Sequence, residues 1–328
     1  MVCALAVRHE HSESTVMTRA NRSVGICCGR HLGAIKCDRM EERNRLAAQF
    51  EQQRSHLRAV AYRMLGSVPE SDDAVQETWL RLSQADCSAV ENLRAWLTTV
   101  IARVSLNMLR ARKSRREHPY VPDPLVSAAA EPAVLVTDSV GLALQIVLDT
   151  LAPAERLAFV LHDIMGLSFE EIAPIVARTP AAARKLASRA RRRVREHAPV
   201  PDRDVVRQHA VVDAFFATAH DGDFDRLVAV LAPDVVLRSD AGPLRPAASV
   251  VVRGPNRVGA RAVGFARLGL DRKPVLVNGA AGVVVFSEGR PFSVMAFTIV
   301  GAKIVEIDIL ADGERLRYLF YRDAAGNL

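Results

Sequence analysis

The chain has 328 residues, a formal net charge of +7 at pH 7 and an isoelectric point near 9.5. Apolar residues make up 49% of the sequence, which is enough to bury real cores and excludes a wholly disordered protein. The length predicts two or three domains, and the basic charge favours anionic partners, nucleic acid first.

Cysteine usage indicates the compartment. The five cysteines form no Cys-x-x-Cys pair, and the His and Cys residues of the first forty positions fit no zinc spacing. No apolar run reaches the ~18 residues of a membrane-spanning helix, and charges at positions 8–10 interrupt any signal-peptide core. We therefore expect a cytoplasmic protein with no disulfide framework, no metal, no cofactor and no membrane partner.

Residues 1–39 carry no apolar period, so we expect a disordered tail there, and Met40 is an alternative translation start. Residues 40–117 predict a helical domain. Its first helix ends at Gly66 and its second follows Pro69.

The third helix of this domain begins near Leu93 and ends in a cluster of cations that no acid balances. Such a helix suits a single strand or a melted duplex, because cations follow the backbone while pockets hold flipped bases. Trp96 lies in the apolar stripe and is expected in the core rather than as a stacking platform. The candidate DNA contacts are Arg103, Asn107, Arg110, Arg112, Lys113, Arg115 and Arg116.

A proline-rich stretch, residues 118–139, predicts an extended linker. Residues 140–199 predict a second helical domain. Within it, Ser168 and Glu171 form a capping box, and a helix opened by Thr179 exposes a basic side.

Two short helices joined by a tight turn, the second one basic, are typical of a helix-turn-helix. Because the turn lacks the usual glycine, we expect either an unusual backbone angle at Ala177 or Arg178 or a different kind of turn. Exposed positions 184, 185, 188 and 189 suit base reading in a major groove. The alternative is a solvated basic face, but the cap, the turn and the charge all favour DNA binding.

Residues 203–322 predict an α+β domain, with two helices followed by strand-like stretches whose last members are separated by glycine-rich turns. We expect an antiparallel meander packed on helices. Acid–base chemistry needs two groups facing one pocket, which a sequence does not reveal, so no enzyme is expected. The candidates would be Asp213, His220, Asp221, Asp240 and Asp308.

Several motifs carry a family resemblance. YRMLGS at 62–67, DDAVQETWLRL at 72–82 and LRAWL at 93–97 resemble region 2 of extracytoplasmic-function (ECF) sigma factors. SFEEIA at 168–173 and TPAAARKLASRAR at 179–191 are similar to region 4 of that family. The resemblance implies a non-enzymatic alternative sigma factor, which binds core RNA polymerase through the β′ clamp helices and the β flap and directs it to promoter DNA.

The resemblance also implies a role for each matched position. Asp72, Asp73, Gln76 and Glu77 match the helix that docks on the β′ clamp helices, although the two aspartates also suit a helix N-terminus. Residues 93–116 match the element that melts and reads the minus-ten promoter element. The residues implied at the minus-thirty-five element are Thr179, Arg184, Lys185, Ser188, Arg189 and Arg192.

The C-terminal part of the sequence resembles that of one subfamily of these sigma factors. YVPDPL at 120–125 resembles the WLPEP linker of sigma factors with a SnoaL-like domain, SDAG at 239–242 resembles their DGGG loop, and DGERL at 312–316 is loosely similar to their NPDKL segment. The resemblance implies a cone-shaped domain that regulates activity in cis and that could receive a small-molecule or protein signal. The implied regulatory residues are Tyr120, Pro122, Asp123, Pro124, Asp240 and Gly242.

An alternative hypothesis is a helix-turn-helix regulator that binds DNA without polymerase and carries a ligand-sensing or cyclase-like C-terminal domain. It predicts specific operator binding by the chain alone.

Overall fold

A computed structural model describes residues 29–85, 92–115, 121–128 and 141–321, apart from the side chains of residues 29–43, 115 and 321. The contacts reported below lie within residues 50–321, which belong to one compact unit. Within the described ranges, no helix is long and apolar enough to cross a membrane. The described side chains also form no cluster of His, Cys, Asp and Glu that could hold a metal ion.

The first helical group comprises α1 (Gly29–Leu65), α2 (Val68–Gln84) and α3 (Leu93–Arg115). The expectation of a tail without structure up to residue 39 is wrong from Gly29 onward, where α1 begins. Once a helix has formed, each further residue costs little, and the Leu, Ala, Lys and Arg residues before Met40 are good helix formers. Gly66, at φ +67°, ends α1 as expected.

The apolar faces predicted for these helices form their core. Leu57, Met64, Leu97 and Ile101 are fully buried. Phe50 packs against Trp79 with ring centroids 5.1 Å apart. Burial of one stripe per helix holds α1, α2 and α3 together.

The second helical group comprises α4 (Leu142–Asp149), α5 (Pro153–Phe159), α6 (Phe169–Val176) and α7 (Pro180–His197). A π-helical turn, Val160–Ile164, extends α5. The predicted capping box at the start of α6 is present, with Ser168 and Glu171 satisfying each other's backbone N–H groups. The helix-turn-helix is confirmed as α6 and α7.

The C-terminal domain contains one seven-stranded sheet in the order β1-β4-β5-β6-β7-β2-β3. Its strands are β1 (Val126–Ala128), β2 (Leu231–Asp240), β3 (Val250–Arg253), β4 (Asp271–Val277), β5 (Ala280–Ser287), β6 (Arg290–Val300) and β7 (Lys303–Leu310). Strands β4 to β7 form the expected antiparallel meander, whereas β2 pairs with β7 in parallel.

Strand β1 comes from the linker and not from the C-terminal domain. Val126, Ser127 and Ala128 pair antiparallel with the edge strand β4, where Val126 lies opposite Val277. Within the stretch predicted to be an extended linker, Val126–Ala128 forms a strand that completes the sheet. Such a strand pairs with the free backbone groups of an open sheet edge. These hydrogen bonds attach the linker to the C-terminal domain.

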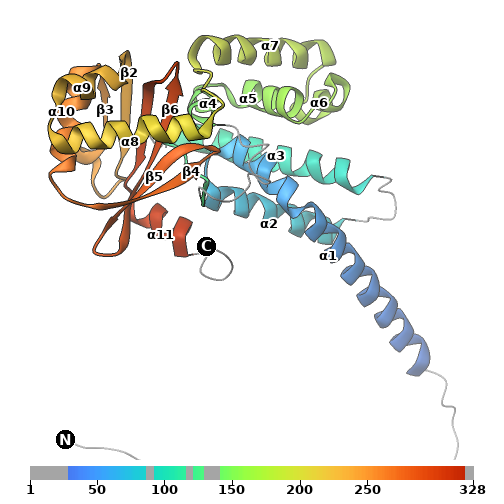
Figure 1. Cartoon of the computed structure of the whole chain (residues 1–328). Helices are drawn as coiled ribbons and strands as arrows, with labels where there is room; N and C mark the ends of the chain where they lie inside the picture. The colour runs from blue at the N-terminus through green and yellow to red at the C-terminus, as the bar shows by residue number, and fades with distance from the viewer. Residues whose placement is uncertain (1–28, 86–91, 116–120, 129–140, 322–328) are drawn as a thin grey trace, which may run out of the picture. The chain divides into compact units, whose positions relative to one another are not determined.

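Both faces of the sheet are covered (Figure 1). Helices α8 (Val205–Asp221), α9 (Phe224–Val230) and α10 (Pro255–Ala266) enclose the main core on one face. The other face packs Val294 and Leu310 against Val121 of the linker, Leu142 of α4 and Leu316 of α11 (Gly313–Tyr321). The second face of the sheet is thus an internal interface with the helical part of the chain.

The sequence did not predict helices α10 and α11. Two glycines and three valines or phenylalanines give α10 a low intrinsic helix propensity. Packing explains one of these glycines, because a Cβ on Gly259 would lie 3.2 Å from the ring of Phe224. Tertiary contacts therefore override local preference in α10.

The turn between α6 and α7 yields a test. Ala177 adopts the left-handed conformation expected there, with φ 54° and ψ 51°. Because glycine occupies that region without a steric penalty, A177G should stabilise the helix-turn-helix by about 0.5–1 kcal/mol. Native-state hydrogen exchange of α6 and α7 amides measures the change. Exposed Ala217 in the interior of α8 is the control, since A217G should destabilise its own helix by about 1 kcal/mol.

Candidate nucleic-acid interface

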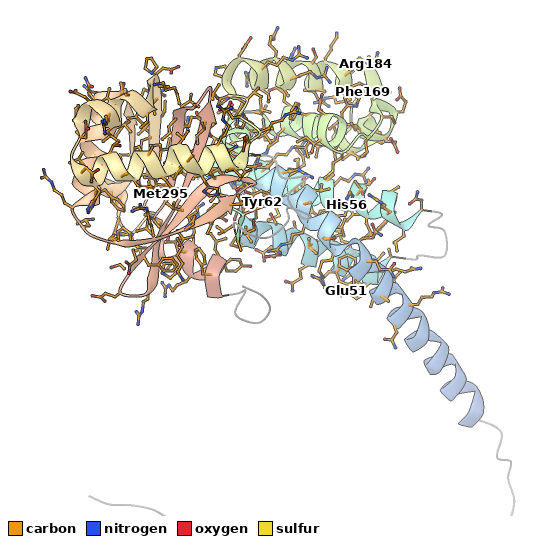
Figure 2. The ribbon with its side chains drawn as sticks, in the orientation of Figure 1. Glu51, His56, Tyr62, Phe169, Arg184 and Met295 are labelled. Atoms are coloured by element: carbon orange, nitrogen blue, oxygen red, sulfur yellow. The ribbon has the colours of Figure 1, made fainter. Side chains whose placement is uncertain are left out.

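Helix α7 presents two sets of cations. Arg184, Lys185, Arg189 and Arg192 are exposed, as is Ser188, so the predicted reading face is accessible. Arg184 lies with its guanidinium 5.2 Å from the centre of the Phe169 ring, which orients it beside the start of α6 (Figure 2). The Thr179 hydroxyl accepts a hydrogen bond from the Ala182 N–H and so serves as the helix cap.

Other arginines of α7 are bound within the protein. Arg191 forms an ion pair of 2.7 Å with Asp163, and Arg193 lies 3.6 Å from Glu155. Both carboxylates belong to α5 and its π-helical extension. The inner side of α7 is therefore neutralised, whereas the outer side keeps its positive charge for an external anion.

Helix α3 carries the second basic surface. Arg103, Asn107, Arg110 and Lys113 are exposed, and the spacing of the first three places them on one face. The Arg103 guanidinium also donates a 3.2 Å hydrogen bond to the carbonyl of Pro174 in α6. One end of this face is thus held against the helix-turn-helix.

Arg112 is a correction to the predicted DNA contacts. Its side chain is 7% exposed, donates a 2.9 Å hydrogen bond to the Leu65 carbonyl and pairs with Glu70. Burial lowers its pKa. Arg112 therefore closes the end of α1 and is not available to DNA in this structure. The Arg115 side chain, Arg116 and Tyr120 lie outside the described residues.

The polar face of α2 is exposed at some positions and bound within the protein at others. Asp73 and Gln76 are exposed, and Glu77 forms a helical ion pair with Arg81, four residues later, at 2.8 Å. Asp72 is engaged inside the protein, because Arg58 lies 3.0 Å from its carboxylate and the Tyr318 hydroxyl donates to it at 3.1 Å. One end of the predicted polymerase-binding face is in contact with α11.

The last carbonyl groups of α1 are satisfied by side chains from other helices. Gln145 of α4 and Arg156 of α5 both donate to the Arg63 carbonyl, at 3.4 Å and 3.1 Å. A helix end leaves such carbonyls without intrahelical partners and attracts cations. These bonds fix the second helical group against the end of α1.

The linker meets the same place. The Asp123 N–H donates to the Gly66 carbonyl at 2.8 Å, and its carboxylate accepts from the Val68 N–H at 2.8 Å. The buried Tyr62 hydroxyl donates to the Asp123 carbonyl at 2.6 Å and accepts from the Asn278 amide at 3.0 Å. Burial raises the pKa of Tyr62, which keeps its hydroxyl protonated as a donor. One tyrosine thereby joins α1, the linker and the sheet.

Arg315 of α11 clamps the linker to the C-terminal domain. It donates to the Asp123 carboxylate at 2.6 Å, to the Asp240 carboxylate at 2.7 Å and to the Val121 carbonyl at 2.7 Å. Both carboxylates are nearly inaccessible to solvent. We call Asp123, Arg315 and Asp240 the linker clamp. It brings together two of the predicted regulatory positions.

The remaining predicted regulatory residues surround the clamp. Pro122 and Pro124 are buried. Gly242 has φ +74°, and a Cβ there would lie 2.1 Å from the Asp312 carboxylate, so no other residue fits without a shift. The Gly242 N–H donates to Asp240 at 3.0 Å, which orients that clamp carboxylate.

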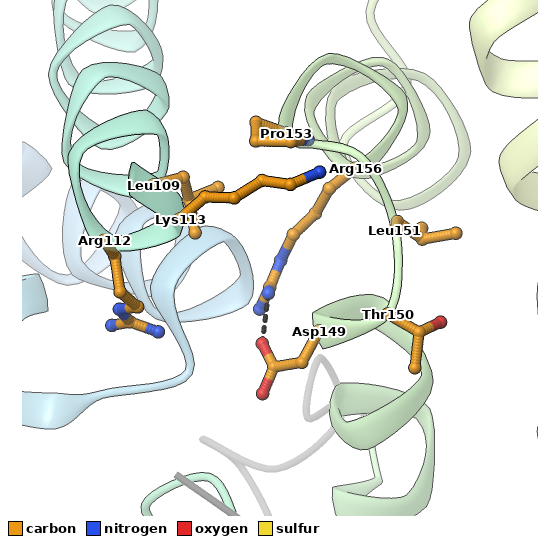
Figure 3. Close-up of a pocket in the computed structure, with 8 residues that line it drawn as sticks. All are labelled: Leu109, Arg112, Lys113, Asp149, Thr150, Leu151, Pro153 and Arg156. Carbon is orange, nitrogen blue, oxygen red and sulfur yellow. Dashed lines mark hydrogen bonds and ion pairs between the residues drawn. The ribbon is translucent and has the colours of Figure 1, made fainter. Parts of the chain in front are cut away.

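A cationic cavity of about 140 Å³ lies between α3 and the α4–α5 turn (Figure 3). Arg112, Lys113 and Arg156 line it, with Asp149 as the acid that pairs with Arg156. Lys113 is exposed at its rim, so this cavity joins the basic end of α3. It adds positive potential beside the predicted minus-ten surface.

The acid–base candidates of the C-terminal domain do not converge. Asp213, His220 and Asp221 are exposed, Asp240 belongs to the linker clamp, and Asp308 is buried beside Arg238 at 2.9 Å. None of them lines the apolar cavity of this domain. The described residues thus bring no pair of these groups together in that cavity.

The sequence did not indicate the roles of Gln145, Arg156, Asn278 and Tyr318. Each bonds to a residue in another domain, between 83 and 246 positions away in the sequence. Their only local signal is a long polar side chain within an apolar stretch, and many surface residues share it.

Comparisons with known proteins match this architecture. Sigma-70 region 2 matches residues 49–115, and Sigma-70, region 4 matches residues 142–194. The chain is 33% identical over 288 residues to the probable ECF RNA polymerase sigma factor SigI of Mycobacterium tuberculosis (strain H37Rv), covering 84% of this chain and 97% of that protein.

A second relative has a solved structure. The ECF RNA polymerase sigma factor SigJ of the same organism is 39% identical over 219 residues, covering 64% of this chain and 70% of that protein. The crystal structure of SigJ from Mycobacterium tuberculosis matches with a TM-score of 0.65 and 31% identity, over 82% of this chain and 97% of that chain. The expected fold class, two helical parts followed by an α+β domain, is confirmed.

The linker clamp can be tested by its energetics. R315Q leaves two buried carboxylates without their cation, so we expect it to lower the free energy of unfolding by about 2–3 kcal/mol. A double-mutant cycle with D240N should give a coupling of about 1–2 kcal/mol in denaturant titrations. R317Q, which removes an exposed arginine bonded only within α11, should change stability by less than about 0.5 kcal/mol. Equal losses for R315Q and R317Q would contradict the clamp.

Proposed function

The chain belongs to the ECF RNA polymerase sigma factors, alternative sigma factors that direct promoter-specific transcription, and on this premise we propose how its surfaces divide the work. Region 2 melts and reads the minus-ten element, region 4 reads the minus-thirty-five element, and the SnoaL-like domain tunes the arrangement of the two. The observation that carries the proposal is the pair of exposed basic faces on α3 and α7, which lie in two helical groups joined by a linker.

The outer face of α7 is proposed to enter the major groove at the minus-thirty-five element. Lys185, Ser188 and Arg189 are exposed within its first turns and can reach base edges, and Arg184 is oriented by Phe169. Arg192 then contacts phosphates, while Thr179 contributes by capping the helix. The ion pairs of Arg191 and Arg193 on the inner side support this division.

The exposed face of α3 is proposed to hold the melted minus-ten strand. Arg103, Asn107, Arg110 and Lys113 provide cations and an amide along one helix, as a single-strand track requires. The cationic cavity beside Lys113 extends this surface toward α5. Arg112 has a different role, since it stabilises the end of α1.

The polar face of α2 is proposed to bind core polymerase at the β′ clamp helices. Asp73 and Gln76 are exposed, and Glu77 and Asp72 complete the face. Region 4 is proposed to contact the β flap. Because Tyr318 of α11 donates a hydrogen bond to Asp72, the C-terminal domain competes with polymerase for one end of this face. Regulation in cis then acts through α11 and the linker clamp.

The direct experiment is reconstitution with core polymerase. The full chain should direct transcripts from specific positions in a library of promoter sequences, and the chain alone should bind the same DNA weakly. Tight operator binding without polymerase, together with no promoter-specific transcripts, would support the polymerase-independent regulator instead.

Base reading by α7 is tested by one substitution. K185A should reduce transcription by about 5- to 100-fold on the preferred promoter, with the loss confined to one base position. R195A, at the exposed far end of the same helix, should lower yield evenly across sequences and reduce the salt slope by about 1. Transcript sequencing from a randomised minus-thirty-five element measures both effects. A uniform loss in K185A argues against base contact.

Competition between α11 and polymerase is tested by Y318F. The substitution removes the hydroxyl that donates to Asp72, so affinity for core polymerase should rise by about 2- to 10-fold. Titration of labelled protein with core polymerase gives the affinity. R317Q, on the same helix, serves as the control and should leave the affinity within about twofold. An unchanged affinity in Y318F would remove α11 from the polymerase-binding model.

A further inference from the structure

The C-terminal domain contains an apolar cavity that none of the functions above uses. Its volume is about 210 Å³, and it lies between the inner face of the sheet and helices α8 and α10. Its apolar lining includes Phe215, Phe216, Phe265, Phe292 and Met295 (Met295 is labelled in Figure 2). Ligand sites are commonly concave and apolar with few polar groups, and this volume suits a body of one or two rings.

Two kinds of polar group define the chemistry of this cavity. Arg245 and Arg261 line it and are exposed, which places them at its mouth. Ser293 is 1% exposed, and its hydroxyl has no hydrogen-bond partner among the described residues. A buried hydroxyl without a partner costs free energy, whereas a bound group with a hydrogen-bonding atom would satisfy it.

The described lining contains no carboxylate, histidine, lysine or tyrosine. Acid–base catalysis therefore lacks its groups in this cavity, and the two arginines favour an anionic head. An apolar ring system fits the phenylalanine wall, a carboxylate fits the arginine mouth, and a hydroxyl opposite the carboxylate fits Ser293. The complementary ligand is a small hydroxylated aromatic acid.

The wall of the cavity is adjacent to the linker clamp. Ser239, Ala241 and Arg245 line the cavity, and Asp240 lies between the first two in the sequence. The Asp240 carbonyl accepts from the Ala311 N–H at 2.6 Å, and Arg245 donates to the Ala311 carbonyl. Ala311 also lines the cavity and precedes Asp312, the residue that caps α11 through the Glu314 N–H.

A ligand in the cavity would therefore order both sides of the clamp. One side is the segment that holds Asp240, and the other is the start of α11, from which Arg315 projects to Asp123. A bound ligand that orders this wall lowers the entropy cost of forming the hydrogen bonds from Arg315 to Asp123 and Asp240. The linker then becomes more tightly held when the cavity is filled.

We propose that the C-terminal domain binds a small hydroxylated aromatic acid in this cavity, and that the bound acid tightens the linker clamp. The regulatory half of this inference rests on the proposed function. The binding half concerns the isolated chain and needs no polymerase.

The test uses 6-hydroxy-2-naphthoate as the probe, with 2-naphthoate lacking the hydroxyl and 2-naphthol lacking the carboxylate. Calorimetry on the full chain should show that 6-hydroxy-2-naphthoate binds about fivefold more tightly than 2-naphthoate. S293A should abolish that preference. R261Q should weaken both acids by about fivefold or more but leave 2-naphthol within about twofold. R257Q, one turn earlier and exposed on α10, is the matched control and should leave all three unchanged.

A cavity-filling variant separates this site from surface binding. A262W places a large side chain into the lining on α10 and should abolish binding of all three probes. Undetectable binding of both acids to the wild-type chain would overturn the proposal. So would binding that survives A262W, or a hydroxyl preference that survives S293A.

Hydrogen exchange tests the coupling. Saturating 6-hydroxy-2-naphthoate should slow exchange in the peptide that covers residues 121–128 by about twofold or more, and R315Q should remove this protection. Unchanged exchange at full occupancy would overturn the coupling while leaving the binding site standing. Negative results in these binding and exchange measurements would leave the proposed promoter-directed function standing. Absence of transcription by the wild-type chain would count against the proposed function and not against ligand binding.

Discussion

The packing of the helical groups within residues 50–321 depends on how the carbonyl groups at the end of helix α1 are satisfied. A helix that ends inside a protein leaves carbonyl oxygens without partners, and each buried one costs about 1–3 kcal/mol. The Arg63 carbonyl accepts hydrogen bonds from Arg156 and Gln145, and the Leu65 carbonyl accepts one from Arg112. These donors come from three different helices, so satisfying one helix end positions all of them.

The same constraint explains why some arginines of a basic protein are not free to bind DNA. Arg156 is 2% exposed, and a buried guanidinium persists only when carbonyls and carboxylates surround it. Arg112 follows the same rule through Leu65 and Glu70. The cations on the exposed sides of α3 and α7 do not need such buried carbonyl and carboxylate partners. Positive charge is thereby divided between arginines that hold the fold together and cations that stay exposed on α3 and α7.

The linker is a structural element rather than a spacer. Strand β1 hydrogen-bonds to the sheet, Asp123 binds the first turn of α2, and Arg315 links Asp123 to Asp240. A movement of β1, Asp123 or Arg315 would displace the other two, because a buried polar network tolerates few alternative arrangements. The linker therefore connects the two helical groups to the C-terminal domain through hydrogen bonds at both of its sides.

The sequence by itself determined the helical groups, the capping box at Ser168, an unusual turn near Ala177 and the strands of the meander, because these follow from local periodicity and backbone sterics. It also predicted that Arg184, Lys185, Ser188 and Arg189 of α7 are exposed. Only the tertiary structure decided the fate of Arg112, the pairing of β1 with β4 and the helical state of α10. Sequence cannot show whether a cation in a basic run faces water or a distant carbonyl, since helix spacing gives the direction of a side chain but not its partner. The linker clamp joins positions 123, 240 and 315, and only folding brings those charges within hydrogen-bonding distance.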